Sequence, residues 1–128
     1  MIPRYRAWDK IHKTMYEVDD IMSIDFGKSK ISVKTLFFER TNYYDFNDIV
    51  LMQSTGLTDK NGKEIFEGDI LGTNDGLLNG VVKFNIDLGM WTNSLIRYNN
   101  FERLCNVASS REIIGNIHTT PELAEVNS

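Results

Sequence analysis

The sequence predicts a mainly β protein: a small bent sheet or β-barrel of short antiparallel hairpins, with one or two short helices near the C-terminus. Two pairs, Asn61-Gly62 and Asn79-Gly80, are typical of two-residue hairpin turns, because both residue types accept positive φ. Apolar residues alternate along segments 31–37 and 80–86, as they do in half-buried strands. Glycines are spaced like the corners of a small barrel, at positions 68, 72, 76, 80 and 89. With 128 residues, the chain is expected to form one domain, residues 1–128, around one modest core.

The stretch from Leu51 to Leu71, LMQSTGLTDKNGKEIFEGDIL, carries most of this turn chemistry. Asn61 and Gly62 are expected to form the turn itself, and Asp59 to accept hydrogen bonds from its backbone N–H groups. A calcium loop is the functional alternative. It is disfavoured because lysines occupy ligand positions and the glycine stands at the wrong offset.

A second structural turn is expected at Glu67-Gly68-Asp69, where the apolar segment is interrupted. Gly68 supplies the special backbone angle of a tight bend, and Asp69 binds its carboxylate to nearby N–H groups. Turn chemistry is again favoured over a metal or acid–base cluster.

The N-terminal segments 4–8 and 14–18 predict a first hairpin, in the most basic part of the chain. A candidate nucleic-acid contact can be drawn here, with Trp8 for stacking and the cations Arg4, Arg6, Lys10 and Lys13. A solvated strand face is the favoured interpretation. The formal net charge of −4 also disfavours nucleic-acid binding, which depends on neutralising phosphates.

Residues 31–40 predict a strand that follows a hairpin turn at Gly27-Lys28-Ser29-Lys30. Nucleotide binding is excluded, because Met22 stands where a phosphate-binding loop needs glycine and a strand follows instead of a helix. Residues 41–48 predict an aromatic-rich connection without lysine or arginine. We expect its Tyr43, Tyr44 and Phe46 to form a protein interface or a second small core.

The C-terminal half predicts strands at 80–86, 90–98 and 112–118, with Val82, Phe84 and Ile86 facing inward. A short helix is expected over 101–106. A final helix should begin at Pro121 and run through Val126, with a capping box between Thr119 and Glu122. Its Leu123 and Val126 would present one apolar stripe to the sheet or to a neighbouring subunit.

Residue types that support catalysis do not occur at suitable spacings. His118 has no His, Cys or acidic partner at ligand spacing, and His12 lies far from it in the sequence, in a predicted loop. No Ser-His-acid order or glycine-rich phosphate loop is present. The single cysteine, Cys105, excludes an intramolecular disulfide and is expected to be a small buried apolar residue. We therefore expect no catalytic residue, no metal and no cofactor. An enzyme whose acidic cluster assembles only in the fold is the disfavoured alternative.

The sequence also predicts a cytoplasmic location. No apolar run approaches the roughly 18 to 20 residues that span a bilayer, and the N-terminus has no apolar segment of the signal-peptide type. We therefore expect no membrane partner.

Three blocks of the chain resemble the YopX family of phage and prophage proteins. The central block, LMQ-x-TGL-x-DKNGKEI-x-EGDI, is the most specific. The flanking blocks are Arg6-Ala7-Trp8-Asp9, and Ile114-Gly115-Asn116-Ile117 with Pro121-Glu122-Leu123. Ser54 and His118 depart from the family pattern, because an aromatic residue is common at both positions. The resemblance implies a mostly β protein of phage origin that acts inside a bacterial host cell and self-associates. It implies no activity and carries over no functional residue.

The function predicted from these observations is a non-catalytic protein-binding or self-assembling module. Its partners would be copies of itself, or a phage or host protein, with Tyr43, Tyr44, Phe46, Leu123 and Val126 at the interface. The alternative is a small β-barrel that binds nucleic acid through the N-terminal basic hairpin.

Overall fold

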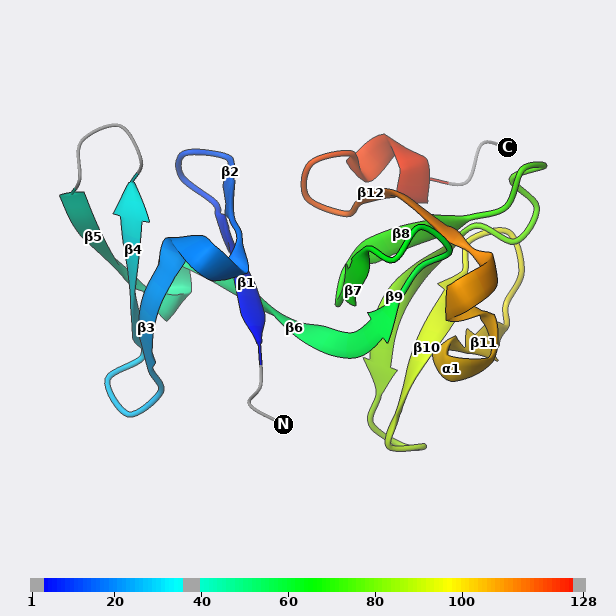
Figure 1. The fold of residues 1–128 in the computed structure, drawn as a ribbon, viewed down its shortest axis with the longest axis horizontal. Coiled ribbons are helices and arrows are strands. Elements are labelled where there is room, and N and C mark those ends of the chain that lie inside the picture. The colour runs from blue at the N-terminus through cyan, green and yellow to red at the C-terminus, as the bar shows by residue number, and fades with distance from the viewer. Residues whose placement is uncertain (1–3, 36–39, 126–128) are drawn as a thin grey trace. The chain divides into compact units, whose positions relative to one another are not determined.

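The computed structural model describes residues 4–35 and 40–125, and it confirms the mainly β class (Figure 1). The chain divides into two compact units, Met1–Gln53 and Ser54–Ser128. Two compact units can belong to one domain or to two, so the single domain over residues 1–128 stays a prediction.

The first unit contains two antiparallel sheets. One pairs β1 (Tyr5–Asp9) with β2 (Thr14–Tyr16) on one side and with the first half of β6 (Ile49–Thr58) on the other. This confirms the N-terminal hairpin. The other sheet has the order β3-β4-β5, formed by β3 (Ile21–Asp25), β4 (Lys30–Thr35) and β5 (Arg40–Asp45). Short 3-10 helices complete the unit: η1 (Val18–Asp20) and η2 (Phe46–Asp48).

The core of the first unit forms where inward positions of these strands meet. Its buried members are Ala7, Tyr16, Ile31, Val33 and Ile49. The predicted strand 31–40 is confirmed as far as Thr35, and its residues 36–39 lie outside the described part. The expected connection at 41–48 is wrong for residues 41–45. They form β5, because every second residue of this segment faces the core side and all six residues of β5 are in register with β4.

The second unit contains a five-stranded antiparallel sheet that curls into a half-barrel (Figure 1). Its order is β11-β10-β9-β8-β12. The strands are β8 (Asp69–Gly72), β9 (Gly80–Asn85), β10 (Met90–Leu95), β11 (Phe101–Arg103) and β12 (Glu112–Asn116). The second half of β6 pairs separately with β7 (Glu64–Phe66). The buried core consists of Ile65, Leu71, Val82, Leu104 and Ala108.

The helices of the second unit are shorter than the sequence predicts. The expected helix 101–106 is a strand, β11, for its first half, followed by α1 (Leu104–Val107) and the 3-10 helix η3 (Ala108–Ser110). Asn100 Oδ1 accepts a hydrogen bond from the Phe101 backbone, yet Phe101–Arg103 pairs with β10, which overrides the cap. The C-terminal helix is a 3-10 helix, η4 (Pro121–Ala124), whose first turn has no side-chain cap.

The turn at Asn61-Gly62 exists, but it is not the expected two-residue type. Asp59 N–H donates to Lys63 O at 2.8 Å, and Gly62 N–H donates to Asp59 O at 3.0 Å. Gly62 has a φ of 80°, whereas Asn61 is not among the residues with positive φ. This is the three-residue loop with a glycine in the left-handed region, the next most common short hairpin connection after the two-residue turns.

Asp59 is the buried anchor of that turn. Its Oδ1 accepts the N–H groups of Asn61 and Lys63, both at 2.9 Å. Its Oδ2 accepts the N–H of Ile113, in β12, at 3.1 Å, and Lys60 N–H donates to Arg111 O at 2.9 Å. The turn therefore holds the last strand of the chain as well as its own hairpin.

The bend at Glu67-Gly68-Asp69 is confirmed. Gly68 has a φ of 88°, and Asp69 Oδ2 accepts the N–H of Phe66 at 2.8 Å. Both backbone groups of Gly68 are used: its N–H donates to Val82 O, and its carbonyl accepts from Ile117. The bend thus connects β8 to two other segments of the unit.

Asn79-Gly80 does not form a hairpin turn. Gly80 is the first residue of β9, and a loop of residues 73–79 connects β8 to β9. The side chain of Asn79 instead accepts a hydrogen bond from Thr73 N–H. A Cβ at Gly80 would collide with the side chain of Asn93, so the glycine is required by close packing against β10.

We expect Asp59→Ala to lower the free energy of unfolding by about 2 to 4 kcal/mol, because three backbone donors lose their acceptor in a buried place. The control is Asp75→Ala in an exposed turn, where Asp75 accepts from Leu77 N–H and Thr73 Oγ1. This change should lower the free energy of unfolding much less, because Asp75 is exposed and water can replace its hydrogen bonds. Urea unfolding measures both, and equal effects would contradict the anchoring role of Asp59.

Candidate functional site

In the first unit, a cluster of polar side chains of types found in active sites surrounds Asp9, at the end of β1. The turn that follows β1 wraps over this carboxylate: its Oδ1 accepts the N–H groups of Ile11 and His12 at 2.9 and 3.0 Å. Asp9 Oδ2 lies 2.7 Å from His12 Nδ1 and accepts from the Tyr16 hydroxyl at 3.1 Å. The hydroxyl oxygens of Tyr16 and Tyr44 are 3.0 Å apart. The Asp9 carboxylate thus contacts both the His12 imidazole and the Tyr16 phenol, and the Tyr16 phenol contacts the Tyr44 phenol.

Burial and hydrogen bonding oppose each other at Asp9. Burial alone raises the pKa of this carboxyl, but hydrogen bonds from the His12 backbone and ring, the Ile11 backbone and Tyr16 lower the pKa below its ordinary value. For Tyr16, burial first and then its contacts with Tyr44 and Asp9 raise the pKa of the phenol. Asp9 therefore stays ionised and Tyr16 neutral at neutral pH.

The Asp9 cluster resembles half of a catalytic constellation, since a carboxylate that orients an imidazole is a common arrangement. Its imidazole side chain is 61% exposed, while the Asp9 side chain is fully buried. The His12 ring is paired with the Asp9 carboxylate, and the nearby Thr14 hydroxyl donates to the His12 carbonyl and not to the ring. Asp9 accepts two hydrogen bonds from the backbone of the turn in addition to its contact with the His12 ring. The cluster therefore serves mainly to fix the β1–β2 turn.

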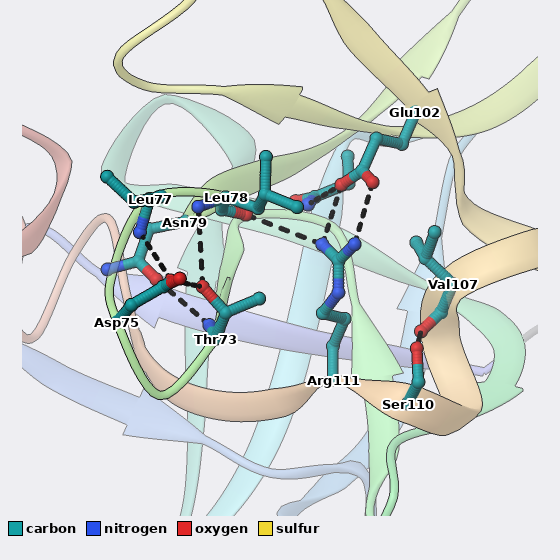
Figure 2. A network of polar contacts seen from close by, with 10 residues as sticks. Thr73, Asp75, Leu77, Leu78, Asn79, Glu102, Val107, Ser110 and Arg111 are labelled. Atoms are coloured by element: carbon teal, nitrogen blue, oxygen red, sulfur yellow. Dashed lines mark hydrogen bonds and ion pairs between the residues drawn. The ribbon is translucent and has the colours of Figure 1, made fainter.

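In the second unit, the main polar network joins Arg111 to Glu102 (Figure 2). The guanidinium donates two parallel hydrogen bonds to the carboxylate, at 2.6 and 2.7 Å. Asn93 Nδ2 adds a third to Glu102 Oε1 at 3.1 Å, and Arg111 Nη1 also reaches Leu78 O at 3.4 Å. The hydrogen bond from Arg111 lowers the pKa of Glu102, burial opposes this, and Asn93 adds to the lowering. The network links β11 and β10 to Arg111, the residue before β12, and both oxygens of Glu102 accept hydrogen bonds.

Other candidate chemistry is limited. Among the described residues, no group of three or more His, Cys, Asp or Glu side chains could hold a metal ion. Cys105 is exposed, so its expected burial is wrong: the four-residue helix α1 buries Leu104 and turns Cys105 outward. That the chain is not an enzyme stays a prediction. In the part of the chain that the structure describes, no helix is long and apolar enough to cross a membrane.

The residues predicted for a protein interface are dispersed. Tyr43 is 73% exposed on β5, and Leu123 is partly exposed on η4. Tyr44 and Phe46 are half-buried against the core of the first unit. Val126 lies outside the described residues.

The residues predicted for a nucleic-acid contact divide into two groups. Arg6 and Trp8 are buried, because β1 is covered by β2 and β6 on its edges and by side chains on both faces. Trp8 therefore offers no free ring face for stacking. Arg4, Lys10 and Lys13 are exposed, and Lys10 Nζ donates to Asn47 O at 2.9 Å.

One exposed apolar surface consists of residues that the sequence analysis placed inside. On β9, Val82 is fully buried as predicted, whereas Phe84 is 44% exposed, and Ile86, the first residue after β9, is 85% exposed. The prediction fails there because the hairpin of β9 and β10 extends beyond the core, which ends near Val82. Leu88, at the hairpin turn, is 51% exposed, and Trp91 lies edge-on to Phe84 with ring centroids 5.2 Å apart.

The comparisons with known proteins fit this fold. A model of the family described as "YopX protein" matches residues 4–125, nearly the whole chain. The chain belongs to the YopX family. Protein EF1440 from Enterococcus faecalis, which has a crystal structure, is 28% identical in sequence to this YopX-family protein. The two structures align with a TM-score of 0.63, and the alignment covers 98% of this chain and 99% of that one. The protein yopX from Bacillus subtilis is 20% identical, with a TM-score of 0.62, covering 95% and 98%, and this likeness shows the fold alone. A comparison with curated proteins finds no match.

For the Asp9 cluster we expect a pH-dependent contribution to stability. The folded-state pKa of Asp9 is lowered, so its contribution is complete above the unfolded value of about 3.9 and disappears as the pH falls through the folded value. Asp9→Asn should therefore lower the free energy of unfolding by about 1 to 3 kcal/mol at pH 7, and by much less near pH 2. Urea unfolding between pH 7 and 2 measures this. Asp87→Asn, at an exposed turn, is the control and should change stability by less than about 0.5 kcal/mol. A pH-independent loss would contradict the ionised, hydrogen-bonded Asp9.

Proposed function

We propose that this YopX-family protein is a phage- or prophage-encoded, non-catalytic module that works by self-assembly in the bacterial cytoplasm, with binding of a phage or host protein as the related possibility. The observation that supports it is the apolar face of the β9–β10 hairpin in the second unit. This face, defined as Phe84, Ile86, Leu88 and Trp91, is called the hairpin face below.

The hairpin face continues the core side of the sheet. Phe84 pairs directly with Trp91, and Val82 pairs with Asn93, so these four residues point to one side of the hairpin. Exposure along that side rises from 0% at Val82 to 44% at Phe84, and Ile86, the first residue of the turn after β9, is 85% exposed. The core side thus stays apolar after the core itself has ended.

Such a surface has an energetic cost when it faces water. Burial of apolar area stabilises by about 25 cal/mol per Å², so a Phe, an Ile and a Leu together supply a driving force of several kcal/mol for association. Contiguous apolar patches of this kind mark interaction sites. Phe and Trp are also among the residues enriched in the centres of interfaces.

A second copy of the chain is the partner that we favour. An isologous contact places the same patch on both subunits, so one apolar hairpin is sufficient to form it. This proposal replaces the dispersed interface expected from the sequence with a surface in one place. It retains the predicted class of function.

We expect the chain to form a defined oligomer, and Ile86→Asp with Phe84→Ser to convert it to a monomer. Both changes remove apolar contacts, and the aspartate would have to be buried without a partner. Size-exclusion chromatography with light scattering measures the mass. Leu77→Asp is the matched control, since Leu77 is 42% exposed in the 73–79 loop of the same unit, outside the hairpin face. A wild-type monomer at all concentrations, or an oligomer that survives the double change, would contradict self-assembly through this face.

A further inference from the structure

We propose that Asn61 is a site of spontaneous covalent modification, at which the side-chain amide is lost as ammonia, and that this change loosens β12 from the turn. The chain contains two Asn-Gly pairs, Asn61-Gly62 and Asn79-Gly80. In such a pair the glycine nitrogen can attack the asparagine side-chain carbonyl, because no Cβ on the glycine crowds the approach. The structure separates the two pairs, since it leaves the first open to this reaction and encloses the second.

The reaction closes one ring and releases one molecule of ammonia. The backbone nitrogen of Gly62 gives its proton to solvent and bonds to Cγ of Asn61. The bond from Cγ to Nδ2 then breaks, and Nδ2 takes a proton from water and leaves as ammonia. Water opens the resulting cyclic imide at one of its two carbonyls. Opening at Cγ yields aspartate, whereas opening at the main-chain carbonyl yields isoaspartate, whose backbone runs through Cγ. Water is the one co-reactant, and nothing is oxidised or reduced.

The surroundings of Asn61 leave room for the ring. Asn61 and Gly62 are both exposed. Apart from the chain neighbours of Gly62, no heavy atom of the described residues lies within 4 Å of the position that a Cβ would take there. The Asn61 amide makes a long hydrogen bond of 3.5 Å to Glu112 Oε1, in an exposed place. Gly62 N–H donates to Asp59 O at 3.0 Å. The side chain is thus weakly held, and one backbone hydrogen bond of a surface turn opposes the attack.

The second pair has the same chemistry in the opposite environment. Asn79 Oδ1 accepts from Thr73 N–H at 3.1 Å, and the Asn79 carbonyl accepts from Ile96 N–H at 2.9 Å. Gly80 is buried in β9, between β8 and β10, and its Cα packs directly against the side chain of Asn93. Ring formation would rotate the peptide unit between Asn79 and Gly80 out of the sheet, against all of these contacts. Asn79 is therefore a control inside the same molecule.

The products change the contact between the turn and β12. The Asn61 amide donates to Glu112, so an aspartate at that position would replace a donor by a second carboxylate and repel Glu112. Isoaspartate would also lengthen by one backbone atom the loop that the hydrogen bond from Asp59 N–H to Lys63 O closes. Ile113, the residue after Glu112, donates its N–H to Asp59 Oδ2. Both products therefore weaken the attachment of β12 to the turn.

The first test incubates the purified full chain at pH 7 and pH 9 and follows its peptides by mass spectrometry. The peptide with Asn61 should gain the mass that separates an acid from an amide, and faster at pH 9, because the attacking nitrogen must lose its proton. The peptide with Asn79 should react at least about tenfold more slowly, because the contacts that hold Gly80 in the sheet add to the barrier. Asn61→Gln should stop the mass gain at that position, since the longer side chain would have to close a larger ring.

The same incubation in concentrated urea shows whether the fold causes the difference. There the two pairs should react at similar rates. Equal rates in the folded protein, no mass gain at Asn61, or a difference that persists in urea would each overturn the proposal.

The second test measures hydrogen–deuterium exchange before and after the incubation. Amides of residues 112–116 should exchange several-fold faster in the aged protein, and those of β1 in the first unit should not change. Asn61→Asp should reproduce the part of the effect that charge causes, whereas aged Asn61→Gln should match its fresh sample. Unchanged exchange at 112–116 in the aged protein would overturn the weakening of β12, and an unchanged Asn61→Asp variant would overturn the repulsion. None of these measurements depends on the oligomeric state, so this proposal and self-assembly fail separately.

Discussion

The second unit depends above all on the carboxylate of Asp59. It is buried, and it binds two N–H groups of its own turn and one of β12, which lies more than fifty residues later in the chain. The same turn binds the carbonyl of Arg111. The guanidinium of Arg111 is thereby placed to hold Glu102, and Glu102 in turn holds Asn93 against Gly80. A continuous series of contacts thus connects the Asp59 carboxylate to β12 at one edge of the sheet and to β11 at the other.

Other conspicuous carboxylates are likewise committed to the fold. Asp59, Asp69 and Glu102 each use their oxygens on backbone or guanidinium donors inside the fold. Asp9 does the same in the first unit. With these carboxylates committed to structure, the proposed self-assembly uses an apolar surface, the hairpin face of the second unit.

The roles of turn residues were predictable from the sequence, but the point at which the core ends along a hairpin was not. Turn residues such as Asp59, Gly62 and Gly68 act over a few neighbours, so their roles could be inferred even where the turn type was wrong. The Asp9–His12 pair lies three residues apart in a predicted turn, a spacing that an Asx-turn analysis could have found. Phe84 and Ile86 have the pattern of core residues, and only the length of the hairpin relative to the core shows that they are exposed. Arg6 is the opposite case, a charged residue that tertiary packing buries.

The central claim is that the hairpin face is covered in solution by another copy of the chain. Hydrogen–deuterium exchange at high and low protein concentration tests this most directly, because it needs no substitution. The account predicts that amides of residues 84–91 become more protected as the concentration rises, while those of the exposed 73–79 loop in the same unit do not change. Exchange at 84–91 that is independent of concentration would contradict it.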